Sequence, residues 1–128
     1  MISNVDIVEV PESGVVRKGW GQEHTLNNKE YCCKVLTFIM GGKTSLHHHA
    51  DKIETFYIAN GTFMLTLIDP MSAKKFKRKL FVGQFQNVPR GHAHRLECVS
   101  EGGGAVVEAS TLDCTWDSYR LEPGDSQV

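Results

Sequence analysis

Apolar and polar residues alternate along many short stretches of this chain, and glycine or other turn residues separate the stretches. A period of two is typical of half-buried β-strands, and no stretch sustains the longer period of an amphipathic helix. Strands are therefore predicted at residues 6–10, 14–17, 31–39, 43–49, 54–58, 62–68, 76–81, 84–88, 94–99 and 104–110. With 128 residues and 41% hydrophobic content, we expect one domain spanning residues 1–128, in which the strands form two packed antiparallel sheets, a jelly roll.

Three histidines and a carboxylate fall near the ends of these predicted strands. His47 and His49 point to the same face of an extended strand, because successive side chains alternate. Glu54 follows a short polar connection and comes back beside this pair. The turn at residues 89–91, which contains proline and glycine, then places His94 at the start of a later strand.

These four side chains form a candidate metal site. Three neutral imidazoles and one carboxylate suit a divalent transition metal ion such as Zn, Mn, Fe, Ni or Co better than Ca or Mg. Four ligands leave room for water or substrate, which indicates chemistry or ligand binding rather than a purely structural ion. The alternative is that the histidines are ordinary solvated residues with no ligand role.

Both histidine segments resemble the paired motifs of the cupin superfamily at every spacing. The first reads Gly41-(x5)-His47-x-His49-(x4)-Glu54-(x6)-Gly61, and the second reads Gly83-(x5)-Pro89-x-Gly91-(x2)-His94. The resemblance implies an all-β fold, the double-stranded β-helix, with a barrel core at roughly residues 34–111, an amino-terminal arm at 1–30 and a carboxyl-terminal tail at 112–128. Cys98 departs from the pattern, because the second motif usually ends in asparagine.

A narrower resemblance points to sugar isomerases of the cupin type. Lys52 gives the order His-x-His-x-x-Lys-x-Glu, and lyxose isomerases carry lysine at this place, whereas cupin-type mannose-6-phosphate isomerases carry arginine. The Lys-Gly-Trp-Gly segment at residues 18–21 and the tail after Glu108 also resemble the latter isomerases, although His47 replaces their usual glutamine. The resemblance implies an aldose–ketose isomerase that acts on a sugar or sugar phosphate through a metal-stabilised enediolate.

In such an enzyme the metal binds adjacent oxygens of an open-chain sugar, and a proton moves from C2 to C1. Lys52 is the candidate that supports a substrate oxygen, unless it is a solvated loop lysine. Candidates for the general base are Glu97, Glu108, Tyr57 and His92. Strand parity places Glu97 on the outward face and makes it the weakest of the four. A hydride shift is the alternative to proton transfer.

Further residues are candidates for holding the substrate, namely Arg90, His92, Arg120 and Cys98. An anionic substrate would need cations at the mouth of the site, for which Lys52, Arg90, Arg95 and Arg120 are available. Two residues also have structural interpretations. Glu108 could form a buried ion pair with Arg120 or Arg95, and Trp20 is better explained as an aromatic lid over the core than as a sugar-stacking surface.

Two other classes of function fit the same motifs. With iron in the site, the protein could be a small dioxygenase, and without turnover it could be a metal-dependent module that binds a sugar or small acid. In each case the partner is a small molecule, and a carbohydrate is favoured. These alternatives differ in a measurable way, because only the dioxygenase consumes oxygen and only the enzymes convert their ligand.

Charge and hydropathy limit the other partners. A formal net charge of −1 gives no reason to expect nucleic-acid binding, and the basic run at residues 74–79 is predicted to be a solvated strand edge. No apolar run is long enough to span a bilayer, so a soluble cytoplasmic protein with no membrane partner is expected.

The four cysteines lack metal or redox spacing and are interpreted as reduced. A homodimer is expected, with the arm at 2–10 covering a neighbour's sheet edge.

Overall fold

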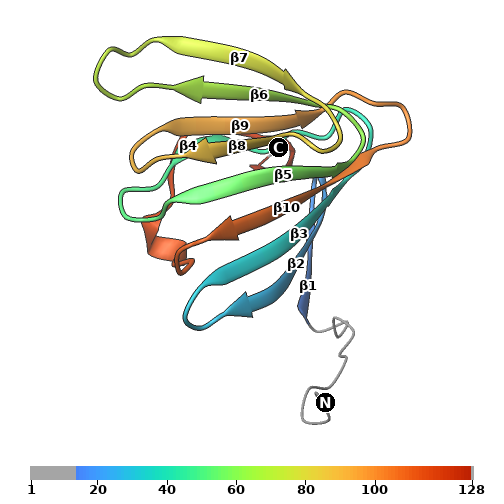
Figure 1. Ribbon diagram of the computed structural model, residues 1–128, viewed down its shortest axis with the longest axis horizontal. Helices are drawn as coiled ribbons and strands as arrows, with labels where there is room; N and C mark the ends of the chain where they lie inside the picture. Colours follow the sequence, from blue (N-terminus) through green and yellow to red (C-terminus); the bar gives the residue numbers. More distant parts are fainter. Residues whose placement is uncertain (1–13, 128) are drawn as a thin grey trace.

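The computed structural model describes residues 14–127, which fold into two antiparallel sheets packed face to face (Figure 1). The six-stranded sheet has the order β1-β2-β3-β10-β5-β8, with β1 Val15–Lys18, β2 Gly21–Asn28, β3 Cys32–Phe38, β10 Gly104–Ser110, β5 Glu54–Asn60 and β8 Phe85–Val88. The five-stranded sheet has the order β11-β4-β9-β6-β7, with β11 Tyr119–Glu122, β4 Leu46–His48, β9 Ala93–Cys98, β6 Phe63–Ile68 and β7 Lys75–Leu80. The predicted all-β jelly roll is confirmed.

Most of the predicted strands are present, with ends that move by no more than three residues. Two strands were not predicted, β2 and β11, and the strand expected at 43–49 is shorter because only Leu46–His48 is extended in β4. The strand expected at residues 6–10 lies outside the described residues. The predicted solvated edge is confirmed, since β7 is the last strand of its sheet and its five residues before Leu80 are exposed.

The hydrophobic core lies between the two sheets, toward one end. Trp20 stacks on Phe38 with ring centroids 4.4 Å apart, and Phe38 meets Phe63 edge to face. Trp20 is 5% exposed and belongs to the core, as expected of an aromatic cover, and it also lines the cavity described below. Ring pairs of this kind stabilise a core beyond the area that they bury.

The inward face of each central strand changes from apolar to polar along its length. In β5 the inward residues run from Glu54 to Phe56 and Ile58, and in β9 they begin with His94. The inward polar residues of β3 and β10 are Lys34 and Glu108, which are directly paired in the register. The alternating pattern that builds the core therefore also points a cluster of polar side chains into the space between the sheets.

Candidate metal centre and cavity

Two neighbouring strands of the smaller sheet bring the histidines together. His47 in β4 is the register partner of His94 in β9, and His49 follows directly after β4 on the same face. Each of these three histidines has one ring nitrogen that lies within 4.8 Å of a ring nitrogen of the other two. His49 and His94 are buried and His47 is half-buried, so the group is a shielded site for a metal ion rather than a surface cluster.

Each of the three imidazoles donates its Nδ1 hydrogen to a backbone carbonyl. His47 donates to the carbonyl of Ser45 at 3.0 Å, and His94 donates to that of His92 at 2.9 Å. His49 donates to the carbonyl of Asp117 at 2.9 Å. A neutral imidazole that donates from Nδ1 keeps its lone pair on Nε2, which is the arrangement that a metal ion requires of a histidine ligand.

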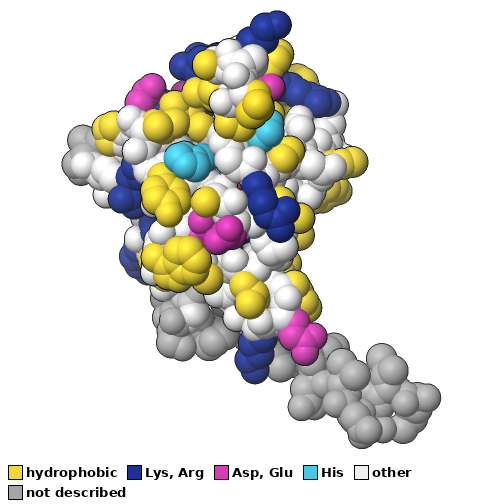
Figure 2. Space-filling model, turned by 90° about the vertical axis from the view of Figure 1, so that its left-hand side faces the viewer, with side chains coloured by type: hydrophobic (Ala, Val, Ile, Leu, Met, Phe, Trp, Pro, Cys, Tyr) yellow, Lys and Arg dark blue, Asp and Glu magenta, His cyan; other side chains and the backbone are white. Residues whose placement is uncertain are grey.

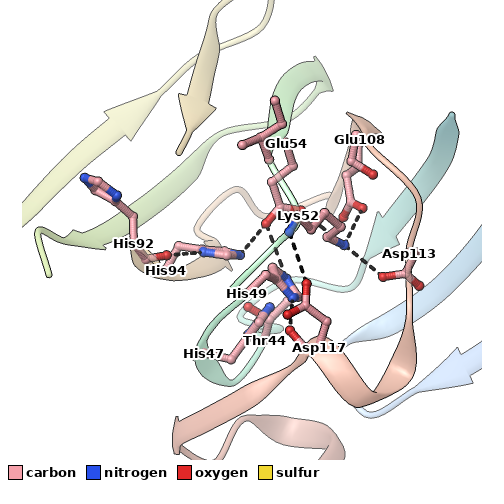
Figure 3. A network of polar contacts seen from close by, with 12 residues as sticks. Thr44, His47, His49, Lys52, Glu54, His92, His94, Glu108, Asp113 and Asp117 are labelled. Carbon is pink, nitrogen blue, oxygen red and sulfur yellow. Dashed lines mark hydrogen bonds and ion pairs between the residues drawn. The ribbon is translucent and has the colours of Figure 1, made fainter. Parts of the chain in front are cut away.

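Glu54 faces the same point from the other sheet (Figure 3). Its Oε1 atom lies 2.7 Å from His94 Nε2 and 3.5 Å from His49 Nε2. Within the described part of the chain, neither Glu54 Oε1 nor His94 Nε2 has a hydrogen-bond partner, although both atoms are buried. Two acceptor atoms this close and this deeply buried need either a shared proton or a cation between them. A divalent ion held by the three Nε2 atoms and Glu54 meets that need, so the residues fit the metal that the motifs imply.

The pKa values of His47, His49 and Glu54 agree with a metal-ligand role, whereas the contact with Glu54 raises the pKa of His94 although burial opposes this. Burial, together with the charges of the neighbouring histidines, lowers the pKa of His47 to about 3. Burial also lowers the pKa of His49, so both rings are neutral near pH 7 and need lose no proton when a metal binds. Burial opposes ionisation of Glu54, but its contacts with His94 and Lys52 hold its pKa below the ordinary value, and the carboxylate is ready to act as a ligand.

Lys52 is buried beside the metal ligands, and three carboxylates surround its ammonium group. Lys52 Nζ lies 3.0 Å from Asp113 Oδ1, 3.3 Å from Glu108 Oε2 and 3.5 Å from Glu54 Oε2. Burial alone would lower the pKa of Lys52, but these carboxylates raise it above its ordinary value. Lys52 is only 5% exposed, so the alternative of a solvated loop lysine is wrong.

Glu108 lies on the far side of Lys52 from the metal ligands (Figure 3). Burial and the negative charge of Glu54 raise the pKa of Glu108 to about 7, against the opposing effect of Lys52. The expected alternative pairing with Arg120 or Arg95 is wrong, because the partner of Glu108 is Lys52, while Arg95 contacts Glu122. A carboxyl group with a pKa near neutrality can both accept and return a proton at pH 7.

A second buried lysine extends this network and was not singled out in the sequence. Lys34 Nζ donates to Glu23 Oε1 at 2.6 Å and to Asp113 Oδ2 at 2.7 Å. Asp113 therefore bridges Lys34 and Lys52, and these lysines lower its pKa to about 2 although burial opposes this. Strand parity could have indicated that Lys34 is buried, since it shares the inward face of β3 with apolar residues.

A cavity of about 300 Å³ opens over this network. It is lined by the three histidines, Glu54, Lys52 and Glu108, and by five hydroxyl side chains, Thr44, Ser45, Thr115, Ser118 and Ser126. Figure 2 looks onto this end of the molecule, where acidic, basic and histidine side chains lie close together among hydrophobic ones. A small cavity rich in charged and hydroxyl groups suits a polar ligand of a few heavy atoms with many hydrogen-bonding groups.

Arg120 is the candidate cation that remains free to meet an anionic ligand. It lines the cavity, and among residues 14–127 it forms no ion pair, whereas Lys52 is surrounded by carboxylates. Arg95 is occupied, because it donates to the carbonyls of Thr44 and Pro123. Arg90 is exposed and does not line the cavity.

Three more residues that the sequence offered as catalytic or substrate-binding candidates do not line the cavity, so those expectations are wrong. Tyr57 is 45% exposed because it lies on the outward face of β5, opposite the inward Phe56. The His92 ring points away from the site in Figure 3, and only the carbonyl of His92 supports His94. Cys98 is fully buried in the hydrophobic core, where its thiol contacts Ser100.

The architecture can now be compared with proteins of known structure. Oxalate decarboxylase from Bacillus subtilis superimposes with a TM-score of 0.71 and 17% identity over 83% of this chain and 29% of its own. The capsular polysaccharide assembling protein CapF from Staphylococcus aureus superimposes with a TM-score of 0.77 and 15% identity, over 84% of this chain and 32% of its own. The chain has the cupin fold. At these identities the likeness shows the fold alone, and this chain spans about a third of the length of those proteins.

Sequence comparison assigns this chain to no protein family. No protein-family model matches the chain, and no curated protein matches its sequence. Within the described residues, no helix is long and apolar enough to cross a bilayer. The cupin fold together with the three-histidine group supports a metal-binding protein, and the chemistry has to be argued from the cavity itself.

Proposed function

We propose that this metal-binding cupin is an aldose–ketose isomerase that acts on a sugar or sugar phosphate. The observation that carries the proposal is the position of Glu108, a buried carboxyl group with a pKa near 7 that contacts Lys52, which in turn contacts Glu54. A proton-transfer enzyme needs such a group beside its electrophilic centre.

His47, His49, His94 and Glu54 would hold the metal ion. When bound, a divalent ion supplies Lewis acidity toward the oxygens of an open-chain sugar and so makes the proton on the adjacent carbon more acidic. The remaining tasks fall to the side chains around it: to remove that proton, to return it to the neighbouring carbon, and to support the charge that develops on oxygen.

Lys52 supports the developing charge. Its raised pKa keeps the ammonium group protonated, and the three carboxylates around it fix its position. A buried ammonium that needs no reorganisation stabilises negative charge on a substrate oxygen more strongly than water does. Because Lys52 stays charged, it acts as a hydrogen-bond donor in this account and not as the base.

Glu108 moves the proton. As the carboxylate it takes the proton from C2, and as the carboxylic acid it returns the proton to C1, while one hydroxyl proton passes from O2 to O1, so the sugar is isomerised with no net change in charge. Burial raises its pKa toward neutrality, which makes both steps accessible near neutral pH. The hydroxyl side chains that line the cavity provide partners for the sugar's other hydroxyl groups.

The proposal is tested with metal-stripped protein reconstituted separately with Mn, Fe, Ni, Co and Zn, and incubated with aldoses, ketoses and their phosphates. We expect metal-dependent interconversion of one aldose–ketose pair, observed by proton NMR. Lys52→Met should lower the rate by about 100-fold or more, as loss of a positioned charge does. The matched control Tyr57→Phe changes an exposed side chain on the outward face of the same strand as Glu54 and should be unaffected.

Failure of this experiment has distinct forms. Absence of conversion with every metal and sugar would contradict the isomerase. Oxygen uptake by the iron-loaded protein would then support a dioxygenase, and ligand binding without turnover would support a binding module. Conversion that persists in the metal-stripped protein would contradict the role of the metal.

A further inference from the structure

His49 differs from the other two histidines in how its ring is held. The carbonyls that accept from His47 and His94 belong to residues two positions earlier in the same segment. The carbonyl that accepts from His49 belongs to Asp117, which lies 68 positions further along the chain. The orientation of this one ring therefore depends on the carboxyl-terminal segment and not on its own strand.

The side chain of Asp117 holds the loop that follows His49. Its Oδ1 accepts from the backbone N–H of Ala50 at 2.9 Å, and its Oδ2 accepts from that of Lys52 at 3.0 Å. The N–H of Asp51 lies 3.2 Å from both oxygens. Three consecutive amides thus converge on one carboxylate that is 3% exposed, which is a concave anion site built from backbone. This loop joins His49 to Glu54 and carries Lys52.

We propose that Asp117 is the positioning residue of the metal centre. Its carbonyl keeps the proton of His49 on Nδ1 and aims Nε2 at the metal position, while its carboxylate fixes the loop at 50–52 and hence the spacing between His49 and Glu54. Residues that hydrogen-bond to metal ligands affect metal affinity, because they fix the orientation of the ligand rings in the metal-free protein. The inference rests on the proposed metal-binding function.

Asp125 offers a matched control within the same segment. Its carboxylate accepts from the backbone N–H of Lys43 at 2.9 Å, and its own N–H donates to the Lys43 carbonyl at 3.1 Å. Like Asp117, it ties the carboxyl-terminal segment to the smaller sheet. Unlike Asp117, it is hydrogen-bonded to neither a metal ligand nor the loop at 50–52. Loss of Asp125 therefore separates general loosening of the tail from loss of the metal geometry.

The test compares zinc affinity in wild type, Asp117→Asn and Asp125→Asn, measured by competition with a chromogenic chelator. The asparagine amide turns a donor toward the backbone N–H groups, so the loop loses at least one of its bonds. We expect Asp117→Asn to bind zinc about 10-fold to 100-fold more weakly, the usual effect of losing such a partner, and Asp125→Asn to stay within about 2-fold of wild type. Equal affinity of the two variants would overturn the inference.

A second measurement needs no variant and decides the matter if Asp117→Asn does not fold. Long-range proton–nitrogen NMR of the metal-free wild type reports which nitrogen of each histidine carries the proton. We expect His49 with its hydrogen on Nδ1, and a hydrogen on Nε2 would overturn the inference. Wild-type protein that takes up none of Mn, Fe, Ni, Co and Zn would contradict the proposed function and this inference together. Uptake by wild type that is unaltered in Asp117→Asn would contradict the inference alone.

Discussion

At the scale of single residues, buried lysines and carboxylates form a connected network of ion pairs. Lys34 and Lys52 are each less than 10% exposed, and each contacts more than one carboxylate. An isolated buried charge costs several kcal/mol, whereas a charge with several hydrogen-bonded partners is tolerated. Within this network Glu108 is the residue whose ionised form is destabilised, since its pKa is raised. The network therefore concentrates its electrostatic cost at the residue that we assign as the base.

This cost predicts a pH dependence of stability. In the unfolded chain Glu108 loses its proton near its ordinary pKa of 4.5, whereas in the folded protein it keeps the proton up to about pH 7. Between these values the folded state binds more protons, so the free energy of unfolding falls as pH rises. Relative to Glu108→Gln, metal-free wild type should lose about 3 kcal/mol across this window, measured by urea unfolding. A difference that stays constant from pH 4.5 to 8 would contradict the shifted pKa.

The metal ligands could be predicted from sequence, but the network behind them could not. His47, His49, Glu54 and His94 have a fixed spacing, and strand parity is enough to turn each of them into the space between the two sheets. Asp113 lies in the tail, and its contacts with Lys34 and Lys52 depend on how that tail crosses the end of the sandwich. Separations of 79 and 61 residues leave no local signal for such contacts.

At the scale of elements, the missed strands lack the pattern on which prediction relied. All four residues of β11 are exposed, and β2 alternates hardly at all in burial, so neither shows the period of two. Both strands form because a neighbour offers an edge: β11 pairs with β4, and β2 pairs with β3. Sheet edges are completed by backbone hydrogen bonds, which side-chain patterning does not report.

The carboxyl-terminal segment packs closely against the β1–β2 turn, which predicts an effect of one added methyl group. A Cβ atom at Gly19 would lie 2.2 Å from the backbone oxygen of Asp125, so Gly19→Ala must displace the segment that lines the cavity through Ser126 and Gln127. We expect a loss of about 1–3 kcal/mol in the free energy of unfolding. Gly102→Ala is the control, because nothing lies within 4 Å of its Cβ position. Equal stability of both variants would show that the segment is not fixed there.

At the scale of the whole molecule, the metal should contribute to stability. The three histidines come from β4, from the residue after it and from β9, and Glu54 comes from the opposite sheet, so a bound ion links the two layers. Zinc at about 100 times its dissociation constant should add about 2.7 kcal/mol and raise the Tm by about 10 °C. His49→Ala and Glu54→Ala should lose this shift in thermal unfolding. A shift that survives in both variants would place the ion elsewhere.

The homodimer stays a prediction of this account. It was argued from an arm at residues 2–10, which lies outside the described residues, and from the exposed strand edges. Strand β7 is such an edge, since it ends the smaller sheet and carries exposed basic residues. Light scattering at micromolar concentration should give twice the mass of 14.3 kDa. A mass of one chain would remove the dimer without affecting the metal centre.

The central claim is that Glu108 transfers a proton between neighbouring carbons of a metal-bound sugar. Its most direct test is proton NMR in D2O of metal-loaded wild type, Glu108→Gln and Tyr57→Phe with the sugar that the wild type converts. We predict deuterium entry at C2 of the aldose in wild type and Tyr57→Phe, and rates of conversion and exchange at least about 100-fold lower in Glu108→Gln. Conversion without deuterium entry, or unchanged rates in Glu108→Gln, would contradict the account.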